Sequence, residues 1–116
     1  MAKKVLIVDN EKDDLESMEK ILENGGYKVE AGSNWERALE KISENAFDLV
    51  LLDILIPETS GYELLRLMKK KSGHKTKFAY VSIVPKQDVD LKEVDGFIQK
   101  PFGNEDFLVA VKSLLK

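Results

Sequence analysis

Two acidic residues, Asp9 and Asp53, each come directly after a run of four apolar residues. Asn10 follows Asp9, and Ser82 and Lys100 come after two further candidate strands. Short apolar runs predict buried strands, and ligands of an open α/β sheet bind beyond the carboxyl ends of its strands. Carboxylates, an amide, a hydroxyl and an ammonium are therefore expected at one edge of a sheet.

This set of side chains suits the transfer of a phosphoryl group to a carboxylate. Asp53 would be the nucleophile and would form an acyl phosphate. Asp9, Asn10 and Asp53 would hold Mg²⁺, a small hard cation that takes few protein oxygens and leaves room for phosphate and water. The cation would offset the repulsion between the carboxylates and the incoming anion. Lys100 and the Ser82 hydroxyl would each bind a phosphate oxygen.

Each of these residues alone has a plainer interpretation. An Asp at the end of a strand is usually a turn former or a helix cap, and a single Lys or Ser there indicates even less. The prediction of a phosphoryl site depends on suitable groups at four strand ends of the same sheet edge.

The elements that must position these groups alternate along the chain. Five short apolar runs are separated by polar stretches with apolar residues at helical spacing, which predicts a βα series and a parallel sheet. The fold class is therefore α/β, with helices on both faces of a five-stranded sheet. The predicted strands are Val5 to Val8, Lys28 to Ala31, Leu49 to Leu52, Phe78 to Val81 and Gly96 to Gln99.

Four helices are predicted from apolar spacing and from the signals at their ends. The first runs from about Lys12 to Asn24 and stops at Gly25-Gly26, and the second follows Ser33 or Asn34 as its N-cap. The third ends in lysines and the last begins with acidic residues, as the helix dipole favours. These two are marked by Leu64, Leu65, Met68 and Lys69 to Lys71, and by Glu105, Asp106, Phe107, Leu108, Val111, Leu114 and Leu115.

The crossover between the fourth and fifth strands is the exception. Between Ser82 and Gly96 only Asp88 to Glu93 looks helical. Pro85 cannot lie inside a helix, because it has no N–H to donate and its ring clashes with the preceding turn. This crossover is therefore expected to be short or irregular.

Composition limits what the chain can be. Its 116 residues, 43% of them hydrophobic, fit a single domain over residues 1–116 whose output comes through contacts with other molecules. A net charge of -3 gives no reason to expect nucleic acid or an anionic membrane as a partner. The lack of cysteine and of any long apolar segment favours a soluble cytoplasmic protein.

Four motifs, taken in this order, resemble the receiver domains of response regulators in two-component signalling, and the likeness covers Lys3 to Lys116. The resemblance implies a flavodoxin-like, doubly wound (βα)5 fold with strand order 2-1-3-4-5. The motifs are Val8-Asp9-Asn10-Glu11, Asp53-Ile54-Leu55-Ile56-Pro57 with Gly61 beyond it, Val81-Ser82, and Lys100-Pro101-Phe102.

The resemblance implies that Asp53 accepts a phosphoryl group from a phosphohistidine of a histidine kinase or phosphotransfer protein. It also implies Mg²⁺ ligands at Asp9, Asn10, Asp53 and the backbone carbonyl of Leu55. The Lys100-Pro101 peptide bond would be cis, which fixes where the ammonium points. The chain would promote only its own phosphorylation and dephosphorylation, and so it would not be an enzyme in the ordinary sense.

A conformational switch is a further implication of the resemblance. Phosphate capture by Ser82 would draw its loop inward, and the aromatic ring of Phe97 would follow. This movement would bias a surface formed by the fourth helix, the fifth strand and the fifth helix, where a downstream target protein would bind.

Three departures from the family pattern leave a second function open. Asn10 replaces the usual second acid, so weaker Mg²⁺ binding is expected, and Ile83 replaces a residue that is normally small, which would restrict phosphodonor access. The segment from Ser82 to Lys100 is shorter than usual by about one helical turn. These features favour the alternative of a pseudo-receiver, which keeps the fold but acts as a phosphorylation-independent interaction module.

Two other interpretations have less support. A flavodoxin-like redox or nucleotide enzyme would need a glycine-rich phosphate loop after the first strand, and the sequence has none there. The lysines from Lys69 to Lys77, with His74 among them, would suit nucleic acid or a histidine phosphocarrier. Ser72 and Gly73 indicate a solvated loop instead, and cations at a helix end are ordinary partners of the helix dipole.

Overall fold

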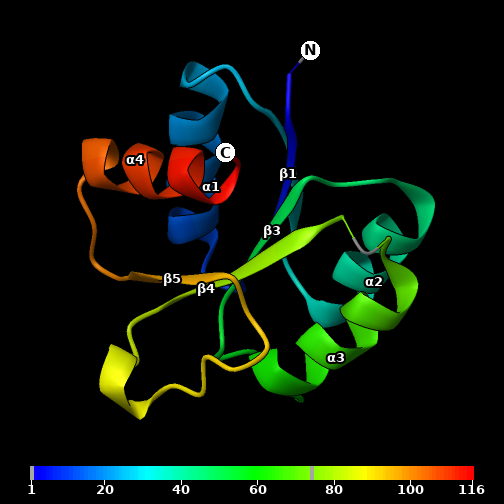
Figure 1. Ribbon diagram of the computed structural model, residues 1–116. Coiled ribbons are helices and arrows are strands. Elements are labelled where there is room, and N and C mark those ends of the chain that lie inside the picture. Colours follow the sequence, from blue (N-terminus) through cyan, green and yellow to red (C-terminus); the bar gives the residue numbers. More distant parts are fainter. Residues whose placement is uncertain (1, 74) are drawn as a thin grey trace.

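The computed structural model describes residues 2–73 and 75–116. His74, for which a solvated loop is predicted, lies outside the described residues. Its strands are β1 (Lys4–Val8), β2 (Lys28–Gly32), β3 (Leu49–Leu52), β4 (Lys77–Ser82) and β5 (Gly96–Gln99). They form one parallel sheet in the order β2-β1-β3-β4-β5 (Figure 1). This arrangement confirms the predicted fold class and strand order.

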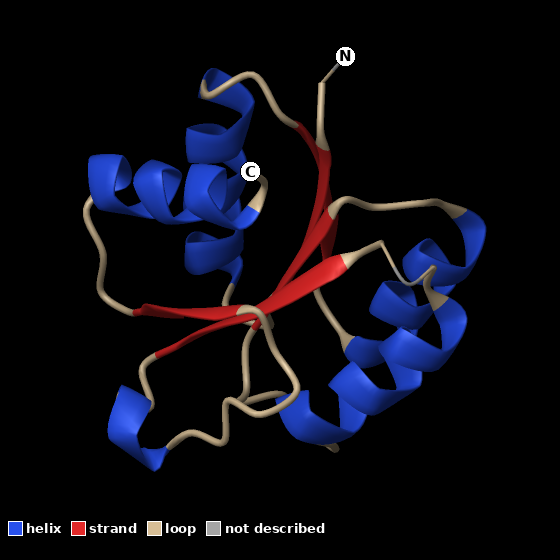
Figure 2. Cartoon of the chain, viewed as in Figure 1, coloured by secondary structure: helices blue, strands red, loops and turns tan. Residues whose placement is uncertain are grey.

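The helices are α1 (Lys12–Asn24), α2 (Trp35–Glu44), α3 (Gly61–Lys71) and α4 (Asn104–Leu114). The pair α1 and α4 covers one face of the sheet, and the pair α2 and α3 covers the other (Figure 2). Asn34 is the N-cap of α2, because its Oδ1 accepts a hydrogen bond from the Arg37 N–H at 2.9 Å. Among the helices of the described residues, none is both long and apolar enough to span a bilayer.

The strands β1 and β3 read as continuous apolar runs because both faces of the sheet are buried. Successive side chains of a strand point to opposite faces. Leu6 and Val8 of β1 therefore pack with α2 and α3, while Val5 and Ile7 pack with α1 and α4. Buried on both sides, these strands hold the residues that follow them in fixed positions at the carboxyl edge of the sheet.

The fourth crossover is irregular, as predicted, but its helical turn lies elsewhere. A single 3₁₀ turn, η1 (Lys86–Asp88), follows Pro85, and the rest of the segment from Asp88 to Glu93 is not helical. Pro85 suits the start of a helical turn, where no N–H partner is needed. The Asp90 carboxylate accepts a hydrogen bond from the Lys92 N–H at 3.0 Å, which competes with helical bonding. The stretch from Asp88 to Glu93, which looks helical in the sequence, therefore forms no α-helix, and the prediction of a short or irregular crossover is confirmed.

This crossover nevertheless contributes to the core. Val89, Leu91 and Val94 are partly buried and pack against the apolar cluster that α2 and α3 share with the sheet. An irregular segment thus covers the part of the sheet where a fourth helix would lie in a regular (βα)5 fold (Figure 1).

Candidate functional site

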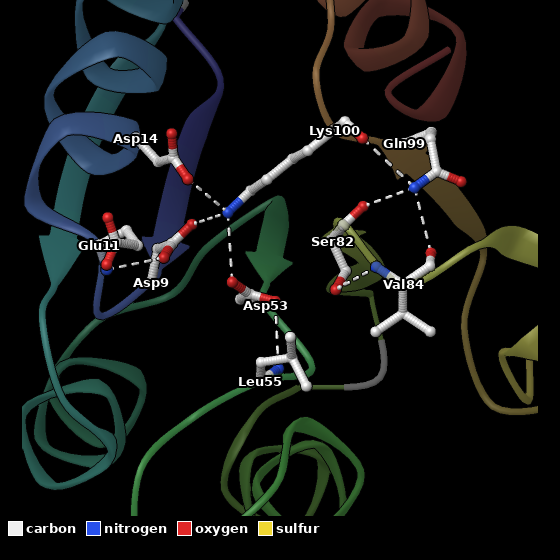
Figure 3. A network of polar contacts seen from close by, with 9 residues as sticks. All are labelled: Asp9, Glu11, Asp14, Asp53, Leu55, Ser82, Val84, Gln99 and Lys100. Carbon is white, nitrogen blue, oxygen red and sulfur yellow. Dashed lines mark hydrogen bonds and ion pairs between the residues drawn. The ribbon is translucent and has the colours of Figure 1, made fainter.

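Three of the predicted site residues, Asp9, Asp53 and Lys100, meet at the carboxyl edge of the sheet (Figure 3). They directly follow β1, β3 and β5, and all three are buried. The Lys100 ammonium donates hydrogen bonds to Asp9 Oδ2 at 2.6 Å and to Asp53 Oδ2 at 3.2 Å. The Lys100-Pro101 peptide bond is cis, as the resemblance implies. Residues far apart in the sequence therefore form one charged cluster.

Both carboxylates are oriented by the turns that follow them. Asp9 Oδ1 accepts a hydrogen bond from the Glu11 N–H at 2.9 Å, and Asp53 Oδ1 accepts one from the Leu55 N–H at 3.1 Å. The short side chain of Asp readily reaches the backbone two residues further on. Each carboxylate thus uses one oxygen to hold its own turn and the other to bind Lys100.

A third carboxylate, absent from the predicted set, binds the same ammonium. Asp14 Oδ2 lies 2.8 Å from Lys100 Nζ. Asp14 is in the first turn of α1, and a helix that directly follows a strand begins at the carboxyl edge of the sheet. It also precedes the buried Met18 by four residues, so both lie on the helix face toward the sheet. This spacing is the signal from which the sequence alone could identify Asp14.

Burial and charge shift the pKa of two of these groups. Burial raises the pKa of Asp9 above its ordinary value, and hydrogen bonds from Lys100 and the Glu11 N–H offset part of that rise. Burial acts to lower the pKa of Lys100, but its hydrogen bonds to Asp14 and Asp9 outweigh this and raise it above the ordinary value. Lys100 therefore remains a cation at neutral pH.

The charge of the cluster suits a divalent cation. When ionised, the three carboxylates exceed the single ammonium by two negative charges. Among the described residues, no three His, Cys, Asp or Glu side chains are arranged as a metal site. Asn10, which directly follows Asp9, and Leu55, two residues after Asp53, line one cavity and would add an amide and a carbonyl oxygen to the two carboxylates. Carboxylate, amide and carbonyl oxygens are ligands that Mg²⁺ accepts, so the residues present fit this ion.

Ser82 and Phe97 lie outside the charged cluster. Ser82 is the last residue of β4 and is buried, and its Oγ accepts a hydrogen bond from the Val84 N–H at 3.3 Å. Within the described part of the chain, no hydrogen bond joins the Ser82 side chain to Asp53 or Lys100. Phe97 on β5 is partly buried and packs against the core on the side of α2 and α3.

Gly61 allows α3 to begin against the backbone of Asp53. The Gly61 N–H donates to the Ile54 carbonyl at 2.7 Å. A Cβ at this position would lie 2.5 Å from Ile54 Cα and 2.6 Å from the Asp53 carbonyl oxygen. No side chain fits this space, so the glycine helps to set the path of the chain at the proposed phosphoacceptor.

The fold and this cluster agree with the comparison to known families. The family model of the response regulator receiver domain matches residues 5–112. The chain therefore belongs to the response regulator receiver domain family, whose members are signalling proteins of two-component systems.

Individual relatives place the chain within this family. Regulatory protein VanRc of Enterococcus gallinarum is 28% identical over 100% of this chain and 51% of its own length, so the chain spans about half the length of such curated relatives. The structure of response regulator TrrA from Thermotoga maritima, in complex with Mg²⁺-BeF, superposes with a TM-score of 0.86 at 30% identity, over 97% of this chain and 99% of that one. The structure of a CheY-like receiver domain from Methanospirillum hungatei JF-1 superposes with a TM-score of 0.85 at 31% identity, over 99% of this chain and 94% of that one.

Proposed function

We propose that the chain is a phosphorylation-dependent signalling switch, in which Asp53 accepts a phosphoryl group from a phosphohistidine of a histidine kinase or phosphotransfer protein. The observation that carries this proposal is the buried Lys100 ammonium bound by both Asp9 and Asp53. Burying a charge is costly, and one carboxylate is enough to pair one ammonium. A second buried acid is best explained by a ligand that the cluster serves.

The proposed reaction forms one bond and breaks another. A carboxylate oxygen of Asp53 attacks phosphorus, the N–P bond of the phosphohistidine breaks, and the leaving imidazole takes the electron pair and a proton from solvent. Lys100 would then exchange Asp53 for a phosphate oxygen, as a point charge. The Ser82 oxygen accepts the Val84 N–H but keeps its own hydrogen, which it would donate to another phosphate oxygen.

Asp9, Asn10, Asp53 and the backbone carbonyl of Leu55 would hold Mg²⁺. When bound, the ion neutralises the carboxylates and the phosphoryl oxygens that they face. The excess of two negative charges around Lys100 supports this assignment, as does the Mg²⁺-BeF complex of the 30% identical TrrA. Asn10 is exposed, so its amide oxygen would bind from the solvent side of the site.

The output surface is proposed to consist of the irregular crossover, β5 and α4, where a downstream target protein would bind. Ser82 pairs with Gln99 in the sheet, and Tyr80 pairs with Phe97. Ser82 is thus joined both to the start of the crossover and to the strand that carries Phe97. A shift of Ser82 toward a phosphate oxygen would be passed to both elements.

Mass measurement of the purified protein tests this function. Incubation with acetyl phosphate and Mg²⁺ should add the mass of one phosphoryl group to the wild type and none to Asp53→Asn. Omission of Mg²⁺ should abolish the addition. Labelling of Asp53→Asn to the wild-type level would show that another residue is the acceptor.

A pseudo-receiver that binds a partner without phosphorylation is the second candidate. It is favoured by Asn10 in place of the usual second acid, by Ile83, which is 64% exposed in the loop after β4, and by the short crossover between β4 and β5. The same experiment separates the two functions, because a pseudo-receiver would gain no phosphoryl group from acetyl phosphate.

A further inference from the structure

Gln99, the last residue of β5, is hydrogen-bonded through its side-chain amide to the loop between β4 and η1 and to the residues on either side of it (Figure 3). Its Nε2 donates to the carbonyl oxygens of Ser82 at 3.0 Å and Val84 at 3.1 Å, and more distantly to that of Lys100 at 3.4 Å. Its Oε1 accepts a hydrogen bond from the Lys86 N–H at 3.2 Å. One side chain thus binds the backbone at the end of β4, at Val84 within the loop and at the start of η1.

Little else in the described structure holds this loop. Ile83 and Pro85 to Asp88 are exposed, so apolar burial contributes little to fixing their positions. The backbone of Ser82 is also bound by the Lys100 N–H at 2.9 Å, but that bond acts only at the end of β4. The conformation of the residues beyond Ser82 therefore depends strongly on the Gln99 amide.

Val84 connects the hydrogen bonds of Gln99 to the hydroxyl of Ser82. The Val84 carbonyl is bound by Gln99, and the Val84 N–H donates to Ser82 Oγ at 3.3 Å. A primary amide has two N–H donors and one carbonyl acceptor, and Gln99 uses both kinds on the same loop. Holding Val84 in place therefore also holds the donor that orients the Ser82 side chain.

We propose that Gln99 is a positioning residue for phosphoryl binding, because through Val84 it restricts the loop that must bring the Ser82 hydroxyl to a phosphate oxygen. This inference rests on the proposed function, in which Ser82 donates to a phosphate oxygen. Gln99 itself touches neither Asp53 nor the site of the phosphoryl group, so it acts through the loop. Its loss should shorten the lifetime of the phosphoryl group without weakening Mg²⁺ binding at Asp9 and Asp53.

Gln99→Met tests the inference, because methionine keeps the length of the side chain and removes the amide. Gln87→Met is the matched control, since Gln87 lies exposed in η1 and no side-chain hydrogen bond of it is found among the described residues. After labelling with acetyl phosphate and Mg²⁺ and removal of the donor, intact mass gives the lifetime of the phosphoryl group. Gln99→Met should shorten it about fivefold, as expected for the loss of one net hydrogen bond, and Gln87→Met should leave it unchanged.

A second background distinguishes positioning of Ser82 from general loosening of the fold. In Ser82→Ala the hydroxyl is absent, so adding Gln99→Met should cause no further loss of lifetime. An equal fivefold loss in that background would overturn the inference, as would a Gln99→Met lifetime equal to that of Gln87→Met. A wild type that takes up no phosphoryl group would overturn the proposed function, and this inference with it.

Discussion

The Lys100 ammonium lies closer to Asp14 Oδ2, at 2.8 Å, than to Asp53 Oδ2, at 3.2 Å. The Asp14 side chain is 44% exposed at the rim of the cluster, whereas that of Asp53 is buried. Lys100 is therefore shared between the proposed phosphoacceptor and a carboxylate outside the predicted set. A phosphoryl group on Asp53 would have to compete with Asp14 for this ammonium.

Asp14→Asn should strengthen the binding of a phosphoryl mimic and weaken the binding of Mg²⁺. The amide oxygen of Asn still accepts a hydrogen bond from Lys100, but the negative charge that repels the anion and attracts the cation is removed. Each affinity should change by about twofold to fivefold, because the partly exposed charge is screened by solvent. NMR titrations with Mg²⁺ alone, and with beryllofluoride at saturating Mg²⁺, measure the two effects.

Asp13→Asn is the control for this prediction, because Asp13 is exposed in the same helical turn and makes no contact with Lys100. It should change both affinities much less than Asp14→Asn does. Affinities for cation and anion that move in the same direction in Asp14→Asn would contradict the electrostatic argument and indicate a change of structure instead.

Gly61→Ala should destabilise the fold by about 1–3 kcal/mol, the range typical of overpacking. The added Cβ would meet backbone atoms of Asp53 and Ile54, which cannot move aside as a flexible side chain does. Urea unfolding measures the change. Gly73→Ala has open space around its Cβ and should stay within about 0.5 kcal/mol of the wild type. Equal stabilities of the two variants would show that α3 does not depend on this close approach.

Most of the fold can be predicted from the sequence because burial leaves a clear pattern in it. β1 and β3 are covered on both faces, so each reads as an unbroken apolar run, and the helices read as apolar stripes. The crossover after β4 lacks such a pattern. Val89, Leu91 and Val94 reach the core from an irregular chain, where the hydrogen bond that Asp90 accepts from the Lys92 N–H competes with helical bonding.

The charged cluster is only partly predictable. Asp9, Asp53 and Lys100 follow strands directly, so strand positions alone place them at one edge. Asp14 requires the phase of α1 as well as its start. Gln99 has no sequence signal, because its role comes from hydrogen bonds to backbone groups of another strand and loop. Such contacts depend on tertiary structure rather than on residue spacing.

Glu30→Gln should lower stability at neutral pH by about 0.5–1 kcal/mol, and the difference should fade in acid. Glu30 accepts from Lys4 at 3.0 Å and from Lys41 at 3.1 Å across the edge strand β2. The pKa of Glu30 lies below its ordinary value, mainly because of the hydrogen bond from Lys4. A lowered pKa contributes stability above the pKa of the unfolded chain, and this is lost as pH falls through the folded value.

Urea unfolding at pH 7 and about pH 3 checks this dependence. Glu16→Gln serves as the control, because Glu16 is exposed on α1 and no ion pair of it occurs among the described residues. A difference between Glu30→Gln and the wild type that persists unchanged in acid would show that the carboxylate charge is not its source.

Ile83→Ala should increase the initial rate of labelling by acetyl phosphate severalfold. Ile83 is 64% exposed and lines a cavity of about 260 Å³ together with Lys100 and Pro101, so its side chain narrows the approach to the ammonium. Because the side chain is mostly exposed, its removal should change stability by no more than about 0.5 kcal/mol. Intact mass at short times measures the rate.

Val109→Ala is the matched control for Ile83→Ala, since Val109 is 66% exposed on α4. It should label at the wild-type rate. A phosphohistidine protein would contact the exposed apolar side chain of Ile83, so the same substitution should speed transfer from that donor less, or slow it. If Ile83→Ala accelerated both donors equally, Ile83 would act as a simple obstruction; if neither rate changed, the entrance would not limit access to Asp53.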